Sequence, residues 1–90
     1  MFSFMPLRSV LKHIPEMERL GVGVVARSQG GFIPAYKRAK YAGSLPDKWL
    51  LKRAAFIGRR LVLYNREPTY RRYLALVAWA YKPKKIPKYS

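Results

Sequence analysis

One stretch near the end of the chain limits the possible folds more than any other: from Tyr73 to Tyr81 every residue is apolar or aromatic. A helix on the surface of a small domain needs one apolar stripe, whereas a helix that is apolar all round has to be buried on every side. The chain has 90 residues, which is little material with which to surround a helix completely. This segment is therefore either the central helix of the fold or a helix covered by other chains, and we favour burial by a partner.

The second half of the chain is predicted to form two helices. The first should cover about residues 45–63, because Ser44 and Asp47 have the spacing of an N-terminal capping box. The second should cover about residues 68–81, since Pro68 is tolerated in the first turn of a helix. With only a short break between them, the two helices are expected to form a helical hairpin.

The rest of the chain is predicted to contain little regular structure. Ile33 precedes Pro34, which favours an extended backbone there, and two prolines in the last nine residues exclude a regular helix. We therefore expect one small, mostly α unit with two main helices, a short N-terminal helix and little independent core. It divides into a short amphipathic helical region (1–20), an extended basic linker (21–43), the helical hairpin (44–81) and an extended basic tail (82–90).

The composition excludes several classes of protein. Cysteine is absent, so the chain has no disulfide framework and no thiolate metal site. One histidine and four acidic residues are too few for a usual metal cage or for the acid and base of an enzyme. The longest stretches without a charged residue are nine residues long, well short of the ~20 apolar residues of a transmembrane helix. We therefore expect no enzymatic activity, no metal site and no bound cofactor.

A surplus of basic residues indicates the class of partner. The chain carries 19 lysines and arginines against four acidic residues, a formal net charge of +15. Such self-repulsion is offset when the chain binds a polyanion such as RNA, DNA or an anionic membrane surface. The basic residues expected to contact it lie in short clusters after residue 36: Lys37, Arg38, Lys40, Lys48, Lys52, Arg53, Arg59, Arg60, Arg71, Arg72, Lys82, Lys84, Lys85 and Lys88.

Aromatic side chains lie near each of these basic clusters. Rings interleaved with basic groups can pack on the sugars or bases of RNA, while the apolar run from Tyr73 to Tyr81 is expected to dock on a neighbouring protein. For any single ring, a place in the protein core is the competing interpretation. The side chains expected to stack on or contact a partner are Tyr36, Tyr41, Trp49, Phe56, Tyr73, Leu76, Val77, Trp79 and Tyr81.

The predicted helix over residues 45–63 is amphipathic and has no acidic residue after Asp47. Helix faces that are merely solvated usually alternate positive and negative charges. We therefore expect the basic side of this helix to face an anion and its apolar side to pack. The apolar side consists of two neighbouring stripes, one of Leu50, Ala54, Ile57 and Leu61 and one of Leu51, Ala55, Gly58 and Val62.

Charge and rings together favour a structural RNA-binding component of a large ribonucleoprotein. We expect an accessory protein of an organellar, mitochondrial ribosome that neutralises rRNA phosphates, bridges to neighbouring proteins and is not a stand-alone monomer. Residues 1–14 are basic, hydroxyl-bearing and free of acidic residues, which is typical of a mitochondrial presequence. An ordinary docking helix would explain the same residues.

A second hypothesis is an accessory subunit of a mitochondrial inner-membrane complex, such as a respiratory complex or ATP synthase. Its basic amphipathic helix would lie on the membrane surface against anionic lipid, with Trp49 and Trp79 in the interface. Both hypotheses place the protein in the matrix or at the matrix face of the inner membrane. A DNA-binding module is disfavoured, because the helix after Pro68 is apolar where base-contacting side chains are needed.

Overall fold

Six α-helices and one short 3₁₀-helix follow one another along residues 2–87, the part of the chain that this computed structural model describes. No strand occurs among these residues, so the prediction of a small, mostly α fold is confirmed. The elements are α1 (Leu7–Lys12), α2 (Ile14–Leu20), α3 (Val24–Arg27), α4 (Phe32–Ala39), the 3₁₀-helix η1 (Ala42–Ser44), α5 (Asp47–Arg66) and α6 (Tyr70–Val77).

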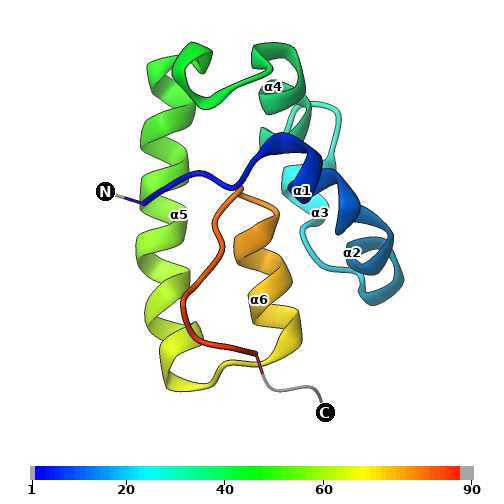
Figure 1. The fold of residues 1–90 in the computed structure, drawn as a ribbon, viewed down its shortest axis with the longest axis vertical. Helices are drawn as coiled ribbons and strands as arrows, with labels where there is room; N and C mark the ends of the chain where they lie inside the picture. The colour runs from blue at the N-terminus through cyan, green and yellow to red at the C-terminus, as the bar shows by residue number, and fades with distance from the viewer. Residues whose placement is uncertain (1, 88–90) are drawn as a thin grey trace.

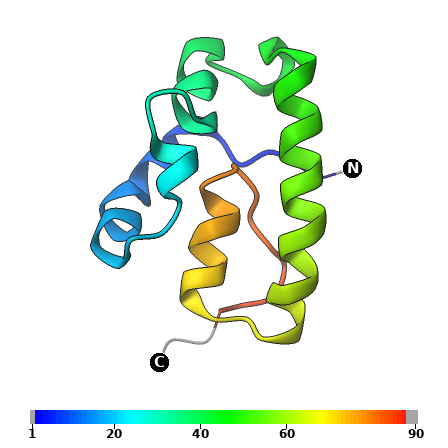
Figure 2. The ribbon, with the colours of Figure 1, turned by 180° about the vertical axis from the view of Figure 1, so that it is seen from behind.

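The long helix α5 runs the length of one side of the molecule (Figure 1). The shorter α6 packs against α5 as the second arm of the hairpin, and it lies between α5 and the N-terminal helices. Seen from behind, in Figure 2, α5 again forms an outer edge that no other helix covers. The molecule measures 36 × 27 × 19 Å along its principal axes.

The two arms of the hairpin begin differently from the predicted capping. Ser44 does not cap α5; its hydroxyl lies in the turn of η1 and donates to the backbone carbonyls of Ala39 and Tyr41. Pro46 takes the position before the helix instead, with no side-chain cap. In α6 the cap is Thr69, whose hydroxyl accepts a 3.2 Å hydrogen bond from the backbone N–H of Arg72.

The prediction of an extended linker over residues 21–43 is wrong, because α3, α4 and η1 lie there. Pro34 is the third residue of α4, where a backbone N–H has no partner within the helix and its loss costs little. Phe32, Ile33 and Tyr36 are buried, and this burial stabilises a helix that the Ile-Pro pair alone disfavours. Gly31 permits the close packing of α3 and α4, because a Cβ there would collide with backbone atoms of α3.

The apolar run over residues 73–81 is the centre of the protein's own core, so the prediction that a partner buries it is wrong. Helix α6 ends at Val77, and the chain then turns through Ala80, which has a φ of 60°. An eight-residue helix followed by a turn is short enough for the rest of the chain to enclose. The residues of this run with no exposed surface are Leu74, Leu76, Val77, Ala78 and Ala80.

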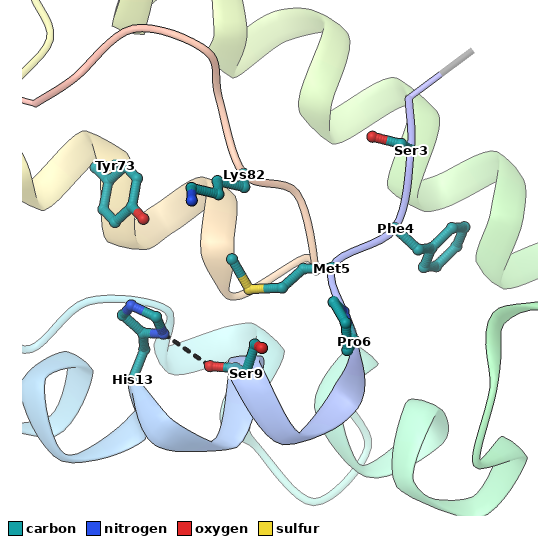
Figure 3. A pocket seen from close by; sticks show the side chains of 8 residues that line it. All are labelled: Ser3, Phe4, Met5, Pro6, Ser9, His13, Tyr73 and Lys82. Atoms are coloured by element: carbon teal, nitrogen blue, oxygen red, sulfur yellow. Dashed lines mark hydrogen bonds between the residues drawn. The ribbon is translucent and has the colours of Figure 1, made fainter.

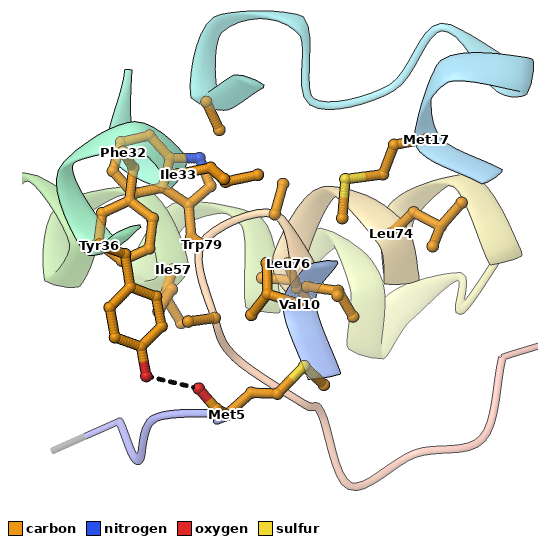
Figure 4. Packing of buried hydrophobic residues seen from close by; sticks show 14 of the residues in the cluster. Met5, Val10, Met17, Phe32, Ile33, Tyr36, Ile57, Leu74, Leu76 and Trp79 are labelled. Atoms are coloured by element: carbon orange, nitrogen blue, oxygen red, sulfur yellow. Dashed lines mark hydrogen bonds between the residues drawn. The ribbon is translucent and has the colours of Figure 1, made fainter. Parts of the chain in front are cut away.

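One hydrophobic cluster joins this segment to the N-terminal segment and to the helices α1 to α5 (Figure 4). It takes Met5 from the N-terminal segment, Val10 and Met17 from α1 and α2, Phe32 from α4 and Ile57 from α5. The expectation of little independent core is therefore wrong: the chain encloses a core of its own, to which each of the six α-helices contributes.

Residues 82–87 of the predicted tail form neither a helix nor a strand and bend at Lys84 and Lys85, and they pack on the protein itself. The Tyr64 hydroxyl donates a 2.7 Å hydrogen bond to the Lys85 carbonyl, and the Lys85 ammonium donates one of 2.7 Å to the Asn65 carbonyl. Pro83 is buried. The rest of the predicted tail, residues 88–90, lies outside the described residues.

Candidate nucleic-acid interface

Helix α5 presents only a narrow strip to the core. Its buried residues are Arg53, Ile57 and Tyr64, which recur at the spacing of one helix face. Trp49, Phe56 and Leu61 flank this strip and are half-buried, whereas most of the remaining circumference is exposed. A 20-residue helix with so narrow an inner face offers an outer surface about 30 Å long.

The side of α5 that faces the core, its inner face, carries Arg53, one of the cations predicted from the sequence to contact a polyanion. Arg53 is only 3 % exposed. Its guanidinium donates to the carbonyls of Trp79 (2.7 Å) and Ala80 (2.9 Å), which follow α6. It also donates to the carbonyls of Phe2 (3.0 Å) and Ser3 (2.7 Å), and it stacks at 3.6 Å on the ring of Phe4. Arg53 therefore joins the start of the chain to the turn after α6, and it is not available to bind RNA.

Four carbonyl oxygens replace the water that this guanidinium loses on burial. Burial lowers the pKa of Arg53 to about 10, and the nearby Tyr36 and Tyr81 act against that shift. The group thus remains positively charged at neutral pH. Five N–H donors in one plane can satisfy several carbonyls at once, which a lysine ammonium in the same place could not do with equal geometry.

On the outer side of α5, Lys48, Lys52, Arg59 and Arg66 form a row that we call the basic row. All four side chains are exposed, and their spacing places them on one face of the helix. From Lys48 to Arg66 the row extends over about 27 Å. Within residues 2–87 the ion pairs are Arg19–Glu16 and Arg72–Glu67, so no member of the row is neutralised there.

Arg66 was missed as a candidate because the predicted helix ended at Leu63. It lies seven residues after Arg59, the spacing that returns to the same helix face, so a longer predicted helix would have included it.

Arg60, by contrast, does not belong to the basic row. It lies 5.2 Å from the ring of Phe56, at the edge of an apolar groove of about 400 Å³ between α3 and the hairpin.

Next to the basic row lies an apolar row of Leu51, Ala55, Gly58 and Val62. These four residues are one of the two stripes expected to pack, but the structure leaves them in solvent. Leu51 is 72 % exposed and Val62 57 %. Of the other stripe, Ile57 is fully buried and Leu61 half-buried, while Leu50 and Ala54 are exposed. The outer side of α5 therefore combines a cationic row with an unpartnered apolar row.

Several predicted contact residues belong to the core and cannot meet a partner. Tyr36 is 3 % exposed and donates a 2.8 Å hydrogen bond to the Met5 carbonyl; burial raises the pKa of its hydroxyl. Leu76 and Val77 are fully buried. Trp79 is 9 % exposed and stacks at 4.9 Å on Phe56, whose ring is itself half-buried.

The remaining predicted rings differ in how they are placed. Tyr41 is 66 % exposed. Trp49 is half-buried, with the Lys52 ammonium 5.2 Å from its ring. Tyr73 and Tyr81 are half-buried too, and they make edge contacts with His13 and Phe2.

The other predicted cations lie on α4 or directly after it, on α6 and on the tail. Lys37 and Lys40 are exposed near the end of α4, and Arg38 shares a hollow of about 230 Å³ with Pro46 and Trp49 at the start of α5. On α6, Arg71 donates to the Leu20 carbonyl and Arg72 pairs with Glu67 at 2.9 Å. Lys82, Lys84 and Lys85 are exposed on the tail, and Lys88 lies outside the described residues.

No group of three His, Asp or Glu side chains among residues 2–87 is arranged to hold a metal ion. The helices in this part of the chain include none that combines the length and the apolar character needed to cross a membrane. Comparison with protein-family models, with curated proteins and with solved structures found no match to the chain.

Proposed function

We propose that this protein is a structural RNA-binding component of a large ribonucleoprotein, specifically an accessory protein of a mitochondrial ribosome. The observation that supports this most is the basic row: four exposed cations on one helix face, over about 27 Å, with no acidic partner among residues 2–87. The cations of this row repel one another, and a regular array of phosphates would offset that repulsion more than water does.

The mechanism is neutralisation of phosphates. Lys48, Lys52, Arg59 and Arg66 replace counterions along an RNA helix, and the released ions make the affinity fall steeply with salt. Because the deep, narrow major groove of an RNA helix keeps these side chains away from the base edges, the protein reads RNA shape more than sequence.

The second part of the function is a bridge to a neighbouring protein, and the apolar row of α5 now provides its surface. The buried run over residues 73–81 cannot play that part. Leu51 and Val62 stand in solvent beside the cations, and burying them against a protein neighbour would gain about 25 cal/mol per Å² of apolar surface. RNA and protein would then meet along adjacent sides of one helix.

An RNA titration over a range of salt concentrations tests this proposal. The probe is an RNA hairpin with a double-stranded stem, and binding is followed by fluorescence anisotropy. In the variant Lys52→Gln/Arg59→Gln, the slope of log affinity against log salt should fall by about 1.5, since each lost phosphate contact removes about 0.7–0.9. The matched control is Arg8→Gln/Lys12→Gln, which removes the same charge from exposed positions on α1.

If the control lowers the slope as much as the α5 variant does, affinity follows net charge and the basic row is not the interface. If the wild-type protein does not bind the hairpin, the proposal of RNA binding fails.

A second candidate function is a subunit lying on the mitochondrial inner membrane as part of a membrane complex. The specific observation in its favour is the same apolar row, because a helix with apolar residues flanked by cations is typical of an interfacial membrane helix. The test is flotation with vesicles made of equal parts phosphatidylcholine and cardiolipin. Flotation that Leu51→Asn/Val62→Asn abolishes, together with no binding to the RNA hairpin, would favour the membrane over the ribosome.

A further inference from the structure

Figure 3 shows a pocket of about 460 Å³ that no residue of the basic row lines. It lies where four segments meet: the N-terminal segment, α1, α6 and the start of the tail. We call it the N-terminal pocket. The lining residues that matter here are Met5, Pro6, Ser9, His13, Tyr73 and Lys82.

The polar side chains of the N-terminal pocket come from distant points of the sequence and converge on one space. Figure 3 shows the His13 ring, Tyr73 and Lys82 around the same opening. The ring of His13 meets that of Tyr73 edge-on, with 6.2 Å between the ring centres. The fold therefore brings an imidazole, a phenol and an ammonium group together.

His13 is held in a defined orientation. Its Nδ1 is 2.7 Å from the backbone carbonyl of Ser9 and donates to it. The other ring nitrogen is left for a ligand: it accepts a hydrogen bond in the neutral ring and donates one when the ring is protonated. A side chain fixed by the backbone loses little conformational freedom when a ligand binds. The Ser9 side chain and the Lys82 ammonium, which is exposed, border the same pocket and can donate as well.

Among residues 2–87, no side-chain carboxylate lines the N-terminal pocket. Two of the four acidic residues of the chain are engaged elsewhere, Glu16 with Arg19 and Glu67 with Arg72. A cavity with one ammonium, an oriented imidazole and hydroxyl groups, and with no acidic wall, favours an anion that accepts several hydrogen bonds. A phosphate group has that chemistry.

We propose that the N-terminal pocket binds a phosphate group, with Lys82 as its cationic partner and the Ser9 hydroxyl as a hydrogen-bond donor. The second ring nitrogen of His13 accepts from a P–OH group of the ligand or, when the ring is protonated, donates to a phosphate oxygen. The pocket is larger than a phosphate ion, and Met5 and Pro6 give it an apolar wall. A nucleotide, whose sugar or base can cover that wall, is therefore expected to bind more tightly than inorganic phosphate. The inference does not depend on RNA binding by α5, because no residue of the basic row lines the pocket.

The single histidine of the chain makes the test direct, because the imidazole C–H signals in a proton NMR spectrum belong to His13 alone. The 90-residue protein is titrated at constant ionic strength with inorganic phosphate, with uridine monophosphate and with uridine. We expect a saturable shift of the His13 signals with both phosphates, at a lower concentration for the nucleotide, and no saturable shift with uridine.

Two variants distinguish binding in the pocket from a general attraction of anions to the positively charged protein. Lys82→Gln should weaken nucleotide binding about tenfold, the effect expected for losing a hydrogen bond to a charged group. Lys84→Gln removes the same charge from the same exposed tail, away from the pocket, and should change the dissociation constant less than about twofold. Both side chains are exposed, so neither substitution threatens the fold.

Three results would overturn the proposal: no saturable shift of His13 with either phosphate, an equal shift with uridine, or equal weakening by the two lysine variants. Equal affinity for phosphate and nucleotide would keep the anion site and identify free phosphate as its ligand. The Lys52→Gln/Arg59→Gln protein should bind the nucleotide like the wild type, so failure of the α5 interface and failure of this pocket give different results.

Discussion

Lys52 and Arg53 are neighbours in one basic cluster of the sequence, yet α5 turns them to opposite regions of the molecule. Lys52 stands in solvent, in the basic row. Arg53 is buried and donates to four backbone carbonyls from the two ends of the fold. On the outer face a cation is free to meet a partner, whereas on the inner face it holds the chain together. Whether a cation contacts a partner or stabilises the fold is therefore decided by its position on the helix and not by its membership of a basic cluster.

The largest expected effect comes from removing the inner cation. Arg53→Met removes the donor of the Phe2, Ser3 and Trp79 carbonyls, whereas the Ala80 carbonyl keeps the backbone N–H of Met5. We expect it to lower the free energy of unfolding by about 3–5 kcal/mol. Denaturant unfolding followed by tryptophan fluorescence measures this. Arg53→Lys should recover only part of the loss, because an ammonium lacks the planar set of donors.

Lys52→Met is the matched control for that substitution, and its cost should stay within about 0.5 kcal/mol. Equal destabilisation by the two methionine variants would contradict the division of α5 into a structural and a contact face.

The two apolar stripes of α5 extend the comparison to uncharged residues. Ile57 is fully buried and Leu51 is 72 % exposed. Ile57→Ala should therefore cost about 2–4 kcal/mol, from lost burial and the cavity left behind, while Leu51→Ala should cost less than about 0.5 kcal/mol. The same unfolding experiment measures both. A large cost for Leu51→Ala in the free protein would show that the apolar row already packs within the chain.

The hairpin could be predicted from the sequence, because its signals are local. A long helical period, a break at a proline and a second apolar segment lie within about 40 residues of each other. The inner face of α5 could not be predicted in the same way, since both of its apolar stripes have the correct spacing. The choice between them depends on where the N-terminal segment and the turn after α6 lie, and those contacts are distant in sequence.

The burial of Arg53 illustrates the same limit. Its carbonyl partners lie 50 and 51 residues before it and 26 and 27 residues after it. Backbone carbonyls are present at every residue, so no sequence pattern marks the four that meet here. Arg66, by contrast, could have been found from the sequence, because it repeats the spacing of Arg59 on the same face.

Two glycines provide a smaller test, with effects of opposite sign. Gly58 lies on the exposed side of α5, and a Cβ there would meet no atom within 4 Å. Gly58→Ala should stabilise the free protein by about 0.5–1 kcal/mol, because alanine is the better helix former. Gly31→Ala should instead destabilise it, since the new Cβ would collide with backbone atoms of Val25 and Ala26. Melting temperatures of the two variants should move in opposite directions, and destabilisation by Gly58→Ala would show that the outer face of α5 is already covered.

The smallest effect is expected from an exposed ion pair, the counterpart of the buried Arg53. Glu16 accepts hydrogen bonds of 2.8 and 2.9 Å from Arg19, and this pairing lowers the pKa of Glu16 below its ordinary value of 4.5. A carboxyl with a lowered pKa in the folded state stabilises the fold above its unfolded pKa, and that contribution is lost as the pH falls through the folded pKa. The difference in melting temperature between the wild type and Glu16→Gln should therefore be small at pH 7 and vanish on acidification below pH 4.5. A difference that persists in acid would show that the contribution of Glu16 does not come from its charge.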